Sequence, residues 1–241
     1  SYGFRPGRNA HDAIVAIQSC IQKRSKFVFD ADISKCFDKI NHDALLNIIG
    51  LKGKYRKQLQ YWLEAGVLDS GTFEATNEGT PQGGVLRPLL ANIAFHGLEN
   101  HLKDCIKQIP VYSSSGKKVR PCRAHETLDV IRYADDFVVL HDNPNVIIHC
   151  KNETRKFLSK RGLELSDAKT RITHTLKIND IESKLIGFDG KIGFNFLGFT
   201  IKQYKTKHKS ANNNKRKFYY KSLIYPSTGS INKHQKELHN I

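Results

Sequence analysis

Carboxylates at the ends of two apolar segments constrain the fold of this chain more than any other feature. Residues 132–140 read Arg-Tyr-Ala-Asp-Asp-Phe-Val-Val-Leu, so Asp135 and Asp136 stand at the crest of an apolar run, and residues 27–33 place Asp32 after another. Unpaired charge is costly to desolvate, so neighbouring acids on half-buried strands need compensation, which a divalent cation can supply. The pattern therefore predicts two strand ends that gather Asp32, Asp135 and Asp136 around Mg²⁺, as phosphoryl transfer requires.

Each of these acids has a plainer explanation when it is taken singly. Asp135 and Asp136 can form an ordinary polar turn. Asp30, Asp32 and Asp38 can cap helices or carry surface charge. Together with the glycine-rich segment described below, the acids favour the metal-site hypothesis.

The composition indicates an anionic partner. The chain has 241 residues, is 39% hydrophobic and carries a formal net charge of +16, which suits one sizeable globular domain, or a domain with an appendage. Nucleic acid is the simplest partner for such a charge, and a solvated basic surface is the alternative. Residues 202–221 contain no acid and interleave basic residues with Tyr204, Tyr219 and Tyr220, a pattern that can bind phosphates and stack on bases. The turn-like residues 211–214 leave a flexible, solvated loop as the alternative.

The cysteines and the hydropathy pattern limit the compartment. The five Cys are an odd number without a Cys-x-x-Cys pair, so disulfides are not implied and a reducing compartment fits better. Cys105, Cys122 and His125 match no standard zinc-site spacing. No stretch reaches transmembrane length and no secretory signal opens the chain, so we expect no membrane partner. A bacterial cytoplasm or an organelle, plastid or mitochondrion, fits equally well.

Irregular alternation of strands and helices favours an α+β fold with an antiparallel sheet packed on helices. Helical spacing predicts that Ile14, Ile17 and Ile21 share the buried face of a helix capped by Asn9. Helices are expected at about residues 9–22, 41–49, 55–65, 85–98 and 145–161 and from residue 230, and strands near residues 27–33, 170–177, 184–188 and 192–202, with a hairpin at residues 128–140 that carries Asp135 and Asp136 at its turn.

The motif Tyr133-Ala134-Asp135-Asp136 resembles the signature of reverse transcriptases. The surrounding segments follow the order found in the group II intron-encoded branch, the intron maturases. The similar segments are Ser1-Tyr2-Gly3-Phe4-Arg5-Pro6-Gly7-Arg8 with His11-Asp12-Ala13, Asp32 through His42, Gly79-Thr80-Pro81-Gln82-Gly83-Gly84-Val85-Leu86 with Pro88 through Asn92, Leu163 through Ser166 with Lys169-Thr170, and Asn195-Phe196-Leu197-Gly198-Phe199.

This resemblance implies a reverse-transcriptase palm with partial fingers and a truncated thumb. It places partial fingers at residues 1–26 and the palm at 27–202, with finger-like elements around 55–83 and an insertion around 110–127. Residues 203–241 would be a basic connection and the start of the thumb or maturase domain. Finger blocks that the family carries upstream are not represented, so we expect a fragment of a longer protein.

The resemblance also implies an activity and its partners. The family performs RNA-directed DNA synthesis, a nucleotidyl transfer from dNTP to a primer 3′-hydroxyl with two Mg²⁺ ions. Its partners would be an RNA template, a DNA primer or target, and the parent intron RNA, whose splicing it would assist.

Matching positions then receive expected roles. Asp32, Asp135 and Asp136 would be the Mg²⁺-binding catalytic carboxylates. Phe37 would lie under the incoming sugar and exclude a ribose 2′-hydroxyl, with core packing as the alternative. Gln82 would contact the nucleotide or template, and Gly83 would allow close backbone approach. Lys169 would lie near the triphosphate, with a plain surface lysine as the alternative. Nucleic-acid contacts are expected from Arg5, Arg8, Arg87, Lys205, Lys207, Lys209, Lys215, Arg216 and Lys217.

One residue departs from the family pattern and keeps two other functions open. Arg87 stands where the family usually has Ser, and a cation at the start of a helix opposes the helix dipole. It would either disturb the template groove or contact template phosphate. The alternatives are therefore an RNA-binding splicing maturase without polymerase activity, or a retron, diversity-generating or CRISPR-associated reverse transcriptase.

Overall fold

The computed structural model describes most of the chain as helices and antiparallel strands. It describes residues 1–34, 40–64, 67–69, 72–74, 87–107, 111–112, 118–119, 127–176, 192–208 and 217–239. The helices are α1 (Ala10–Ile21), α2 (His42–Ile49), α3 (Gly53–Glu64), α4 (Arg87–Ala94), α5 (Leu98–Lys107), α7 (Pro144–Ser159) and α9 (Thr228–His239). The strands are β1 (Phe27–Ala31), β2 (Ile33–Ser34), β3 (Val67–Asp69), β4 (Thr72–Glu74), β5 (Val111–Tyr112), β6 (Lys118–Val119), β7 (Asp129–Tyr133), β8 (Asp136–His141), β9 (Glu164–Leu165), β10 (Arg171–His174), β11 (Phe194–Phe196), β12 (Phe199–His208) and β13 (Lys217–Pro226).

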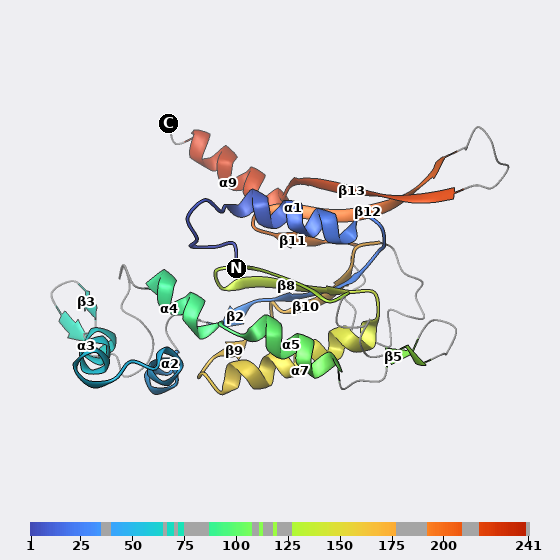
Figure 1. Cartoon of the computed structure of the whole chain (residues 1–241). Coiled ribbons are helices and arrows are strands. Elements are labelled where there is room, and N and C mark those ends of the chain that lie inside the picture. Colours follow the sequence, from blue (N-terminus) through green and yellow to red (C-terminus); the bar gives the residue numbers. More distant parts are fainter. Residues whose placement is uncertain are drawn as a thin grey trace.

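A four-stranded antiparallel sheet, in the order β10-β1-β8-β7, forms the centre of the fold. Helix α1 lies on one face of this sheet, and α4, α5 and α7 lie on the other (Figure 1). The arrangement confirms the predicted α+β fold with an antiparallel sheet packed on helices. Among the described residues, no helix is both long and apolar enough to cross a membrane.

Two apolar clusters cover the two faces of the sheet. On the α1 face, Ile14, Ile17 and Ile21 pack against Val28 and Val138, as their helical spacing predicts. On the opposite face, alternate strand residues contribute to a larger cluster with α4, α5 and α7. The strand residues of that larger cluster include Phe27, Phe29, Ala31, Phe137, Val139 and Ile172.

Local sequence signals set several helix ends. The Asn9 side chain accepts a hydrogen bond from the Asp12 backbone N–H, and the Asp12 carboxylate accepts one from the Asn9 N–H, which completes a capping box. The Asn41 side chain caps α2 by accepting a hydrogen bond from the Ala44 N–H, and Gly50 ends this helix with a φ of 70°. The predicted beginnings of these two helices are confirmed.

The helix expected at residues 85–98 is two helices in the structure. Helix α4 ends at Ala94, and the chain turns through Phe95–Gly97 before α5 begins at Leu98. Gly97 adopts a φ of 84°, which side-chain-bearing residues rarely take, and this interrupts the helix. The continuous apolar spacing of the segment concealed the break, and α5 was not predicted.

The C-terminal segment forms a second sheet, in the order β11-β12-β13, instead of the single strand predicted at residues 192–202. Leu197 and Gly198 have φ values of 49° and 81°, so the chain reverses in two residues and Phe196 pairs with Phe199. Strands β12 and β13 then pair from Phe199–Pro226 to His208–Lys217. The loop alternative is therefore wrong for residues 202–208 and 217–221, which are strands, and β12 runs through the expected palm boundary at residue 202.

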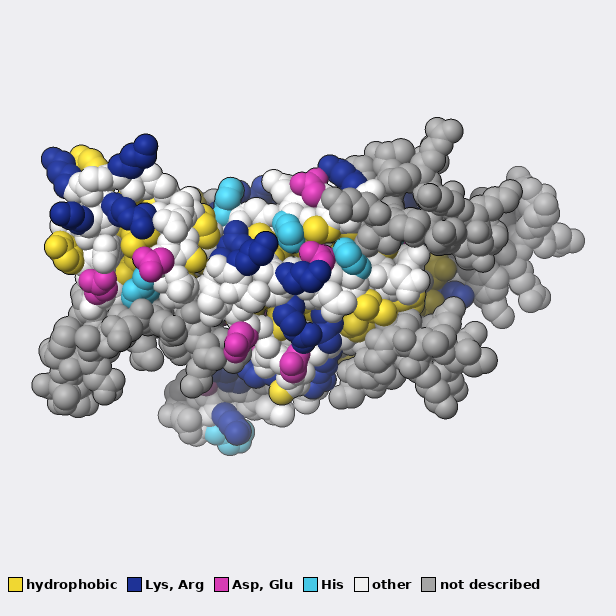
Figure 2. All heavy atoms as spheres, turned by 90° about the horizontal axis from the view of Figure 1, so that it is seen from below, with side chains coloured by type: hydrophobic (Ala, Val, Ile, Leu, Met, Phe, Trp, Pro, Cys, Tyr) yellow, Lys and Arg dark blue, Asp and Glu magenta, His cyan; other side chains and the backbone are white. Residues whose placement is uncertain are grey.

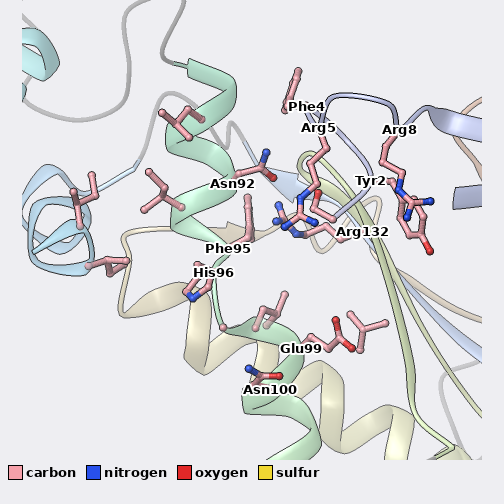
Figure 3. Close-up of a pocket in the computed structure, with 18 residues that line it drawn as sticks. Tyr2, Phe4, Arg5, Arg8, Asn92, Phe95, His96, Glu99, Asn100 and Arg132 are labelled. Carbon is pink, nitrogen blue, oxygen red and sulfur yellow. The ribbon is translucent and has the colours of Figure 1, made fainter. Parts of the chain in front are cut away.

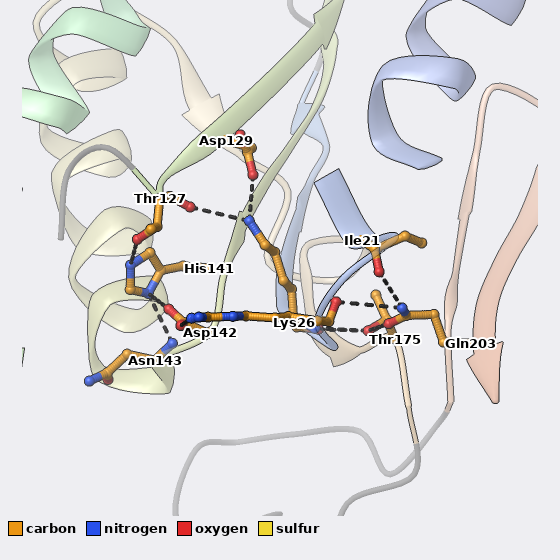
Figure 4. Close-up of polar contacts among 10 residues, drawn as sticks. Ile21, Lys26, Thr127, Asp129, His141, Asp142, Asn143, Thr175 and Gln203 are labelled. Atoms are coloured by element: carbon orange, nitrogen blue, oxygen red, sulfur yellow. Dashed lines mark hydrogen bonds and ion pairs between the residues drawn. The ribbon is translucent and has the colours of Figure 1, made fainter. Parts of the chain in front are cut away.

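Buried polar contacts join the second sheet to the edge of the first (Figure 4). Gln203 is 3% exposed, accepts a hydrogen bond from the Thr175 hydroxyl and donates one to the Ile21 carbonyl. The Lys26 backbone N–H donates to the Thr175 hydroxyl, and the Lys26 ammonium pairs with Asp129 at 2.5 Å. These contacts satisfy polar groups that would otherwise be buried without partners. The strand expected at 184–188 and most of the insertion expected at 110–127 lie outside the described residues.

Candidate active site

The acidic residues of β1 and β8 meet at one end of the central sheet. These neighbouring strands pair Asp30 with Val138 and Ala31 with Phe137, so the next facing positions are Asp32 and Asp136. Side chains alternate between the faces of a strand, which places Asp30, Asp32 and Asp136 on the face that also carries Val28. The apolar surface under α1 thus gives way to carboxylates toward this end of the sheet.

A strained turn presents Asp135 beside them. Strands β7 and β8 are joined by Ala134 and Asp135, and Tyr133 pairs with Asp136 to close the hairpin. The sequence therefore predicted the position of this turn correctly. Ala134 has a φ of 58°, a conformation uncommon for residues other than glycine. Such backbone strain is concentrated at functional sites in folded proteins.

Burial and the neighbouring carboxylates raise the pKa values of two of the acids, Asp30 and Asp136. Burial, then repulsion from Asp136 and Asp32, raises the pKa of Asp30 to about 7, although Arg171 opposes the rise. Burial, then repulsion from Asp135 and Asp32, raises the pKa of Asp136 to about 6, and Lys169 opposes it. The Asp136 residue as a whole is exposed at the turn, so solvent and salt will screen its shift more than that of Asp30. The site therefore carries more negative charge than its own cations neutralise.

The turn after β9 brings Lys169 to this group. This turn holds the backbone of Asp32, because the Ser166 N–H and the Thr170 hydroxyl both donate to the Asp32 carbonyl. The Lys169 ammonium then lies 3.5 Å from an Asp32 carboxylate oxygen. Lys169 remains 72% exposed, so its ion pair with Asp32 contributes little to stability and leaves the ammonium accessible.

The N-terminal segment lies against the same turn. The Tyr2 N–H donates to the Arg132 carbonyl at 2.7 Å, and the Asn92 side chain donates to the Gly3 carbonyl at 3.3 Å. A Cβ on Gly3 would lie 2.4 Å from the Ala134 nitrogen, which is closer than atoms can approach. Glycine at this position therefore allows the segment that carries Arg5 to pack against the turn that carries Asp135.

Replacing Gly3 by Ala should detach this segment from the turn. We expect the free energy of unfolding to fall by about 1–3 kcal/mol, as for other overpacked sites, measured by urea denaturation. Gly229→Ala is the matched control, because a Cβ there meets its nearest atom, the Ser227 hydroxyl, at 3.9 Å. An unchanged unfolding midpoint in Gly3→Ala would show that the segment does not rest on the turn.

A cavity of about 960 Å³ lies between the N-terminal segment, the α4–α5 turn and β7. Arg5, Arg8 and Arg132 line it together with Glu99 (Figure 3). The Arg8 guanidinium lies 5.8 Å from the Tyr2 ring centroid, and that of Arg132 lies 5.4 Å from the Phe95 ring centroid. This cavity can accommodate an anionic chain. Arg132 pairs with Phe137, so its side chain lies on the face of the sheet opposite Asp30, Asp32 and Asp136.

The remaining predicted site residues are not brought to this group by the described part of the structure. Lys205 is exposed on β12, in the second sheet. Arg87 begins α4, and Lys207 and Lys217 lie on β12 and β13, but the described structure does not extend to their side chains. Phe37, Gln82, Gly83, Lys209, Lys215 and Arg216 lie outside the described residues.

Two residues, one in the acidic group and one in the cavity, received no role from the sequence. Asp30 was treated only as a possible cap or surface charge, yet its spacing from Asp32 already places both on one face of a strand. Arg132 precedes the acidic turn by three residues, and nothing in the sequence indicated that it lines the cavity. Assigning the residues of the first apolar run to alternate faces of a strand would have grouped Asp30 with Asp32.

The donor atoms at the acidic site are of the type that binds Mg²⁺. It consists of carboxylates whose mutual repulsion a divalent cation would relieve, and carboxylate oxygens are the ligands that Mg²⁺ prefers. Among the described residues, Asp32, Asp135 and Asp136 do not bring three ligand oxygens within 4.8 Å of one another, whereas His101, Cys105 and Glu153 do form such a cluster elsewhere.

Comparisons with known proteins agree with the motif order. Residues 1–201 match the family described as reverse transcriptase (RNA-dependent DNA polymerase). The group II intron-encoded protein LtrA of Lactococcus lactis is 31% identical over 239 residues, covering 80% of this chain and 39% of LtrA. Protein YkfC of Escherichia coli is 29% identical over 229 residues, covering 86% of this chain and 56% of YkfC. The putative COX1/OXI3 intron 2 protein of Saccharomyces cerevisiae is 27% identical over 243 residues, covering 84% of this chain and 27% of that protein.

Solved telomerase structures share the fold. Telomerase of Candida tropicalis in complex with the TWJ fragment of telomeric RNA superposes with a TM-score of 0.52 at 13% identity, covering 78% of this chain and 31% of the telomerase. The apo form truncated from the C-terminal domain superposes with a TM-score of 0.50 at 14% identity, covering 80% of this chain and 36% of the telomerase. The chain thus spans about two fifths of LtrA and a smaller part of these telomerases. From the family match over residues 1–201, the chain belongs to the reverse transcriptase family, and its similarity to LtrA and the intron proteins places it with the group II intron reverse transcriptases and maturases.

Proposed function

We propose that this chain carries the polymerase site of a group II intron reverse transcriptase and extends a primer 3′-hydroxyl with dNTPs on an RNA template. The observation that carries the proposal is the convergence of Asp30, Asp32 and Asp136 on one face at the end of the central sheet. The raised pKa values of Asp30 and Asp136 support it, because an acidic group without enough cations is what an enzyme that binds divalent metal needs.

Asp32, Asp135 and Asp136 would hold two Mg²⁺ ions. When bound, Mg²⁺ lowers the pKa of the primer hydroxyl and neutralises charge on the triphosphate. The hydroxyl oxygen forms a bond to the α-phosphorus, the bond from that phosphorus to the bridging oxygen breaks, pyrophosphate leaves, and the hydroxyl proton passes to solvent. The backbone hydrogen bonds that fix Asp32 would keep its carboxylate in position throughout.

Lys169 would bind the outgoing phosphates. Its ammonium is exposed and lies next to Asp32, so a triphosphate that approaches the acids would meet one cation among them. A compact ammonium on a flexible stem suits a phosphate contact that changes during the reaction. Arg5 and Arg8 would contact the template or the triphosphate from the adjoining cavity.

Primer extension is the direct test of the proposal. An RNA template with an annealed DNA primer, dNTPs and Mg²⁺ should give extended products with this chain or with the longest protein that contains it. Replacement of Mg²⁺ by EDTA should abolish the products. RNA binding without extension in the longest protein would instead favour a splicing maturase that lacks polymerase activity, and would make Arg87→Ser the first reversion to test.

Phe37 should determine the choice between deoxyribonucleotides and ribonucleotides. Replacing it with Val should increase incorporation of NTP relative to dNTP by at least about tenfold, because a smaller side chain admits the 2′-hydroxyl. The ratio of kcat/KM for the two substrates measures this effect. An unchanged ratio in an active Phe37→Val enzyme would assign Phe37 to core packing alone.

A second function, binding of the intron RNA to assist its splicing, is supported by one face of the second sheet. Ile201 and Gln203 point from β12 into the protein, so the alternate positions point outward. The outward face carries Lys202, Tyr204, Lys221, Leu223 and Tyr225, and the Lys202 ammonium lies 5.3 Å from the Tyr225 ring centroid. Ammonium groups beside exposed tyrosine rings provide phosphate contacts and stacking surfaces for RNA.

Charge removal on this face should weaken RNA binding without changing its sequence dependence. For Lys202→Ala, Lys221→Ala together we expect the slope of log affinity against log salt to decrease by about 1–2, one unit per lost phosphate contact. Binding is measured by fluorescence anisotropy between low and moderate salt. Lys107→Ala, which removes an exposed lysine paired with Asp104 on α5, is the control and should leave the slope unchanged. Equal slopes in the double variant and the native chain would place the RNA elsewhere.

The division of the chain belongs to the same proposal. It gives partial fingers at residues 1–26, a palm at 27–202 and the start of a thumb from 203. The family match ends at residue 201, next to the proposed end of the palm. Strand β12 runs through residue 202, so in this proposal the thumb connection would begin within the second sheet.

A further inference from the structure

Three metal-binding side chains meet between α5 and α7, on the face of the central sheet opposite α1. His101 and Cys105 lie one turn apart on α5, and Glu153 lies on α7. Cys105 Sγ lies 3.7 Å from His101 Nε2 and 3.6 Å from Glu153 Oε2, and the last two atoms are 3.6 Å apart. In the part of the chain that is described, these residues form the group of three potential ligands whose donor atoms all lie within 4.8 Å.

These separations match the coordination of zinc. Zn²⁺ binds sulfur at about 2.3 Å and nitrogen or carboxylate oxygen at about 2.0–2.2 Å, so adjacent ligands of a tetrahedral ion are about 3.3–3.6 Å apart. All three observed distances are near that range. An ion placed between the three side chains would therefore draw each donor atom inward only slightly.

Neighbouring residues already hold the ligands in orientation. Lys156 donates a hydrogen bond of 2.7 Å to Glu153 Oε1, which leaves Oε2 directed at His101 and Cys105. The His101 ring packs on the Phe157 ring at a centroid distance of 5.3 Å. The side chains of His101 and Glu153 are 33% and 13% exposed, so the site is partly removed from water and still open to an entering ion. Partners that orient ligands in this way are part of metal sites and raise their affinity.

We propose that His101, Cys105 and Glu153 bind a Zn²⁺ ion that joins α5 to α7, with water in the fourth position. Cys105 binds as the thiolate, and its proton, which the thiol now shares with Glu153, passes to solvent. No standard sequence spacing marks the site, because its ligands come from two helices. The site is independent of the acidic group, which lies on the α1 face of the sheet.

The position of the site suggests what the ion does. Helices α5 and α7 form the layer under the central sheet, and Figure 2 shows histidine, acidic and basic side chains intermixed on this lower face. A ligand that binds only the folded state stabilises that state in proportion to its concentration and affinity. Bound zinc would therefore stabilise the packing of α5 and α7 under the sheet, and it would not contact the acids on the other face.

Titration with Co²⁺, a spectroscopic substitute for Zn²⁺, tests the proposal. With excess Mg²⁺ present to occupy the acidic group, the native chain should bind one equivalent of Co²⁺ and develop a thiolate-to-metal charge-transfer band in the near ultraviolet together with visible bands of tetrahedral cobalt. Added Zn²⁺ should remove both. Cys105→Ser should lose the charge-transfer band. His101→Gln and Glu153→Gln should weaken binding by at least about tenfold, since even the outer partners of a metal site change affinity by that much.

Cys20→Ser is the matched control, because Cys20 is another half-buried cysteine, on α1 and away from the cluster. Its spectrum and affinity should equal those of the native chain. With excess Mg²⁺ present, Zn²⁺ should also raise the melting temperature of the native chain and of Cys20→Ser by several degrees, and leave that of Cys105→Ser unchanged. Absence of saturable binding, Co²⁺ binding without the sulfur band, or a band that survives in Cys105→Ser would overturn the proposal.

Discussion

Primer extension should fall by at least about 10³-fold when Asp135 and Asp136 are both replaced by Ala, while RNA binding stays within about twofold of the native value. The loss is expected to be of the size seen when a charge-stabilising group is removed from a phosphoryl-transfer site. RNA binding should persist, because phosphate contacts depend on cations and not on these acids. Gel analysis of extension and anisotropy with the same RNA measure the two quantities side by side.

Asp142→Ala is the matched control for this pair. Asp142 is an exposed acid just beyond the other end of β8, where it pairs with Arg24 at 3.4 Å, so its loss removes a charge from the same hairpin without touching the acidic group. It should retain near-native extension. The chain spans 39% of LtrA, so both variants are also made in the longest protein that contains it. Extension that survives in the double Asp variant would remove these acids from the proposed function.

Asp30→Asn should raise the free energy of unfolding by about 2–4 kcal/mol at pH 8 in EDTA, an unusual gain for a single substitution in a sheet. Burial in the folded protein raises the pKa of Asp30 to about 7, from 3.8 for an isolated aspartate side chain in water. The folded state therefore holds this proton over a range in which the unfolded chain has released it. Its contribution to stability falls as pH rises from about 4 to about 7, and above that range the ionised group destabilises the fold.

Urea unfolding of the native chain and of Asp30→Asn between pH 4 and pH 8 measures this contribution. The two curves should lie close together near pH 4 and separate as the pH rises. Mg²⁺ should reduce the difference at pH 8 if it binds the acidic group, because the ion relieves the repulsion. Asp167→Asn, which removes an exposed carboxylate paired with Arg155, should change stability by less than about 1 kcal/mol at any of these pH values. A constant difference across the range would show that Asp30 is not held protonated in the fold.

The sequence predicted those parts of the fold that depend on local pattern. Asn9 and Asn41 begin helices because their side chains accept from backbone N–H groups three residues away, a requirement visible in the sequence itself. The turn at Asp135 was also predictable, because two adjacent acids interrupt an apolar run and a buried strand would not carry two unpaired charges. The motif order identified the family that the match over residues 1–201 shows.

Features set by backbone geometry were harder to predict. Gly97 ends one helix and redirects the chain into another, but glycine also occurs within helices, so the apolar spacing predicted one continuous helix. Leu197 adopts a φ of 49° although leucine seldom does, and the reversal it makes with Gly198 converted one expected strand into a hairpin. The basic residues after 202 were interpreted by charge, whereas their strands are set by cross-strand pairing over ten residues.

The sequence by itself determined the family, the antiparallel α+β architecture and the acids that carry the proposed chemistry, because motif order and apolar periodicity are properties of short segments. Only the tertiary structure decided which distant side chains meet. It set Lys169 beside Asp32, brought Gly3 against Ala134 and assembled His101, Cys105 and Glu153 from two helices. These contacts depend on the packing of elements far apart in the chain, and no local preference of the residues encodes them.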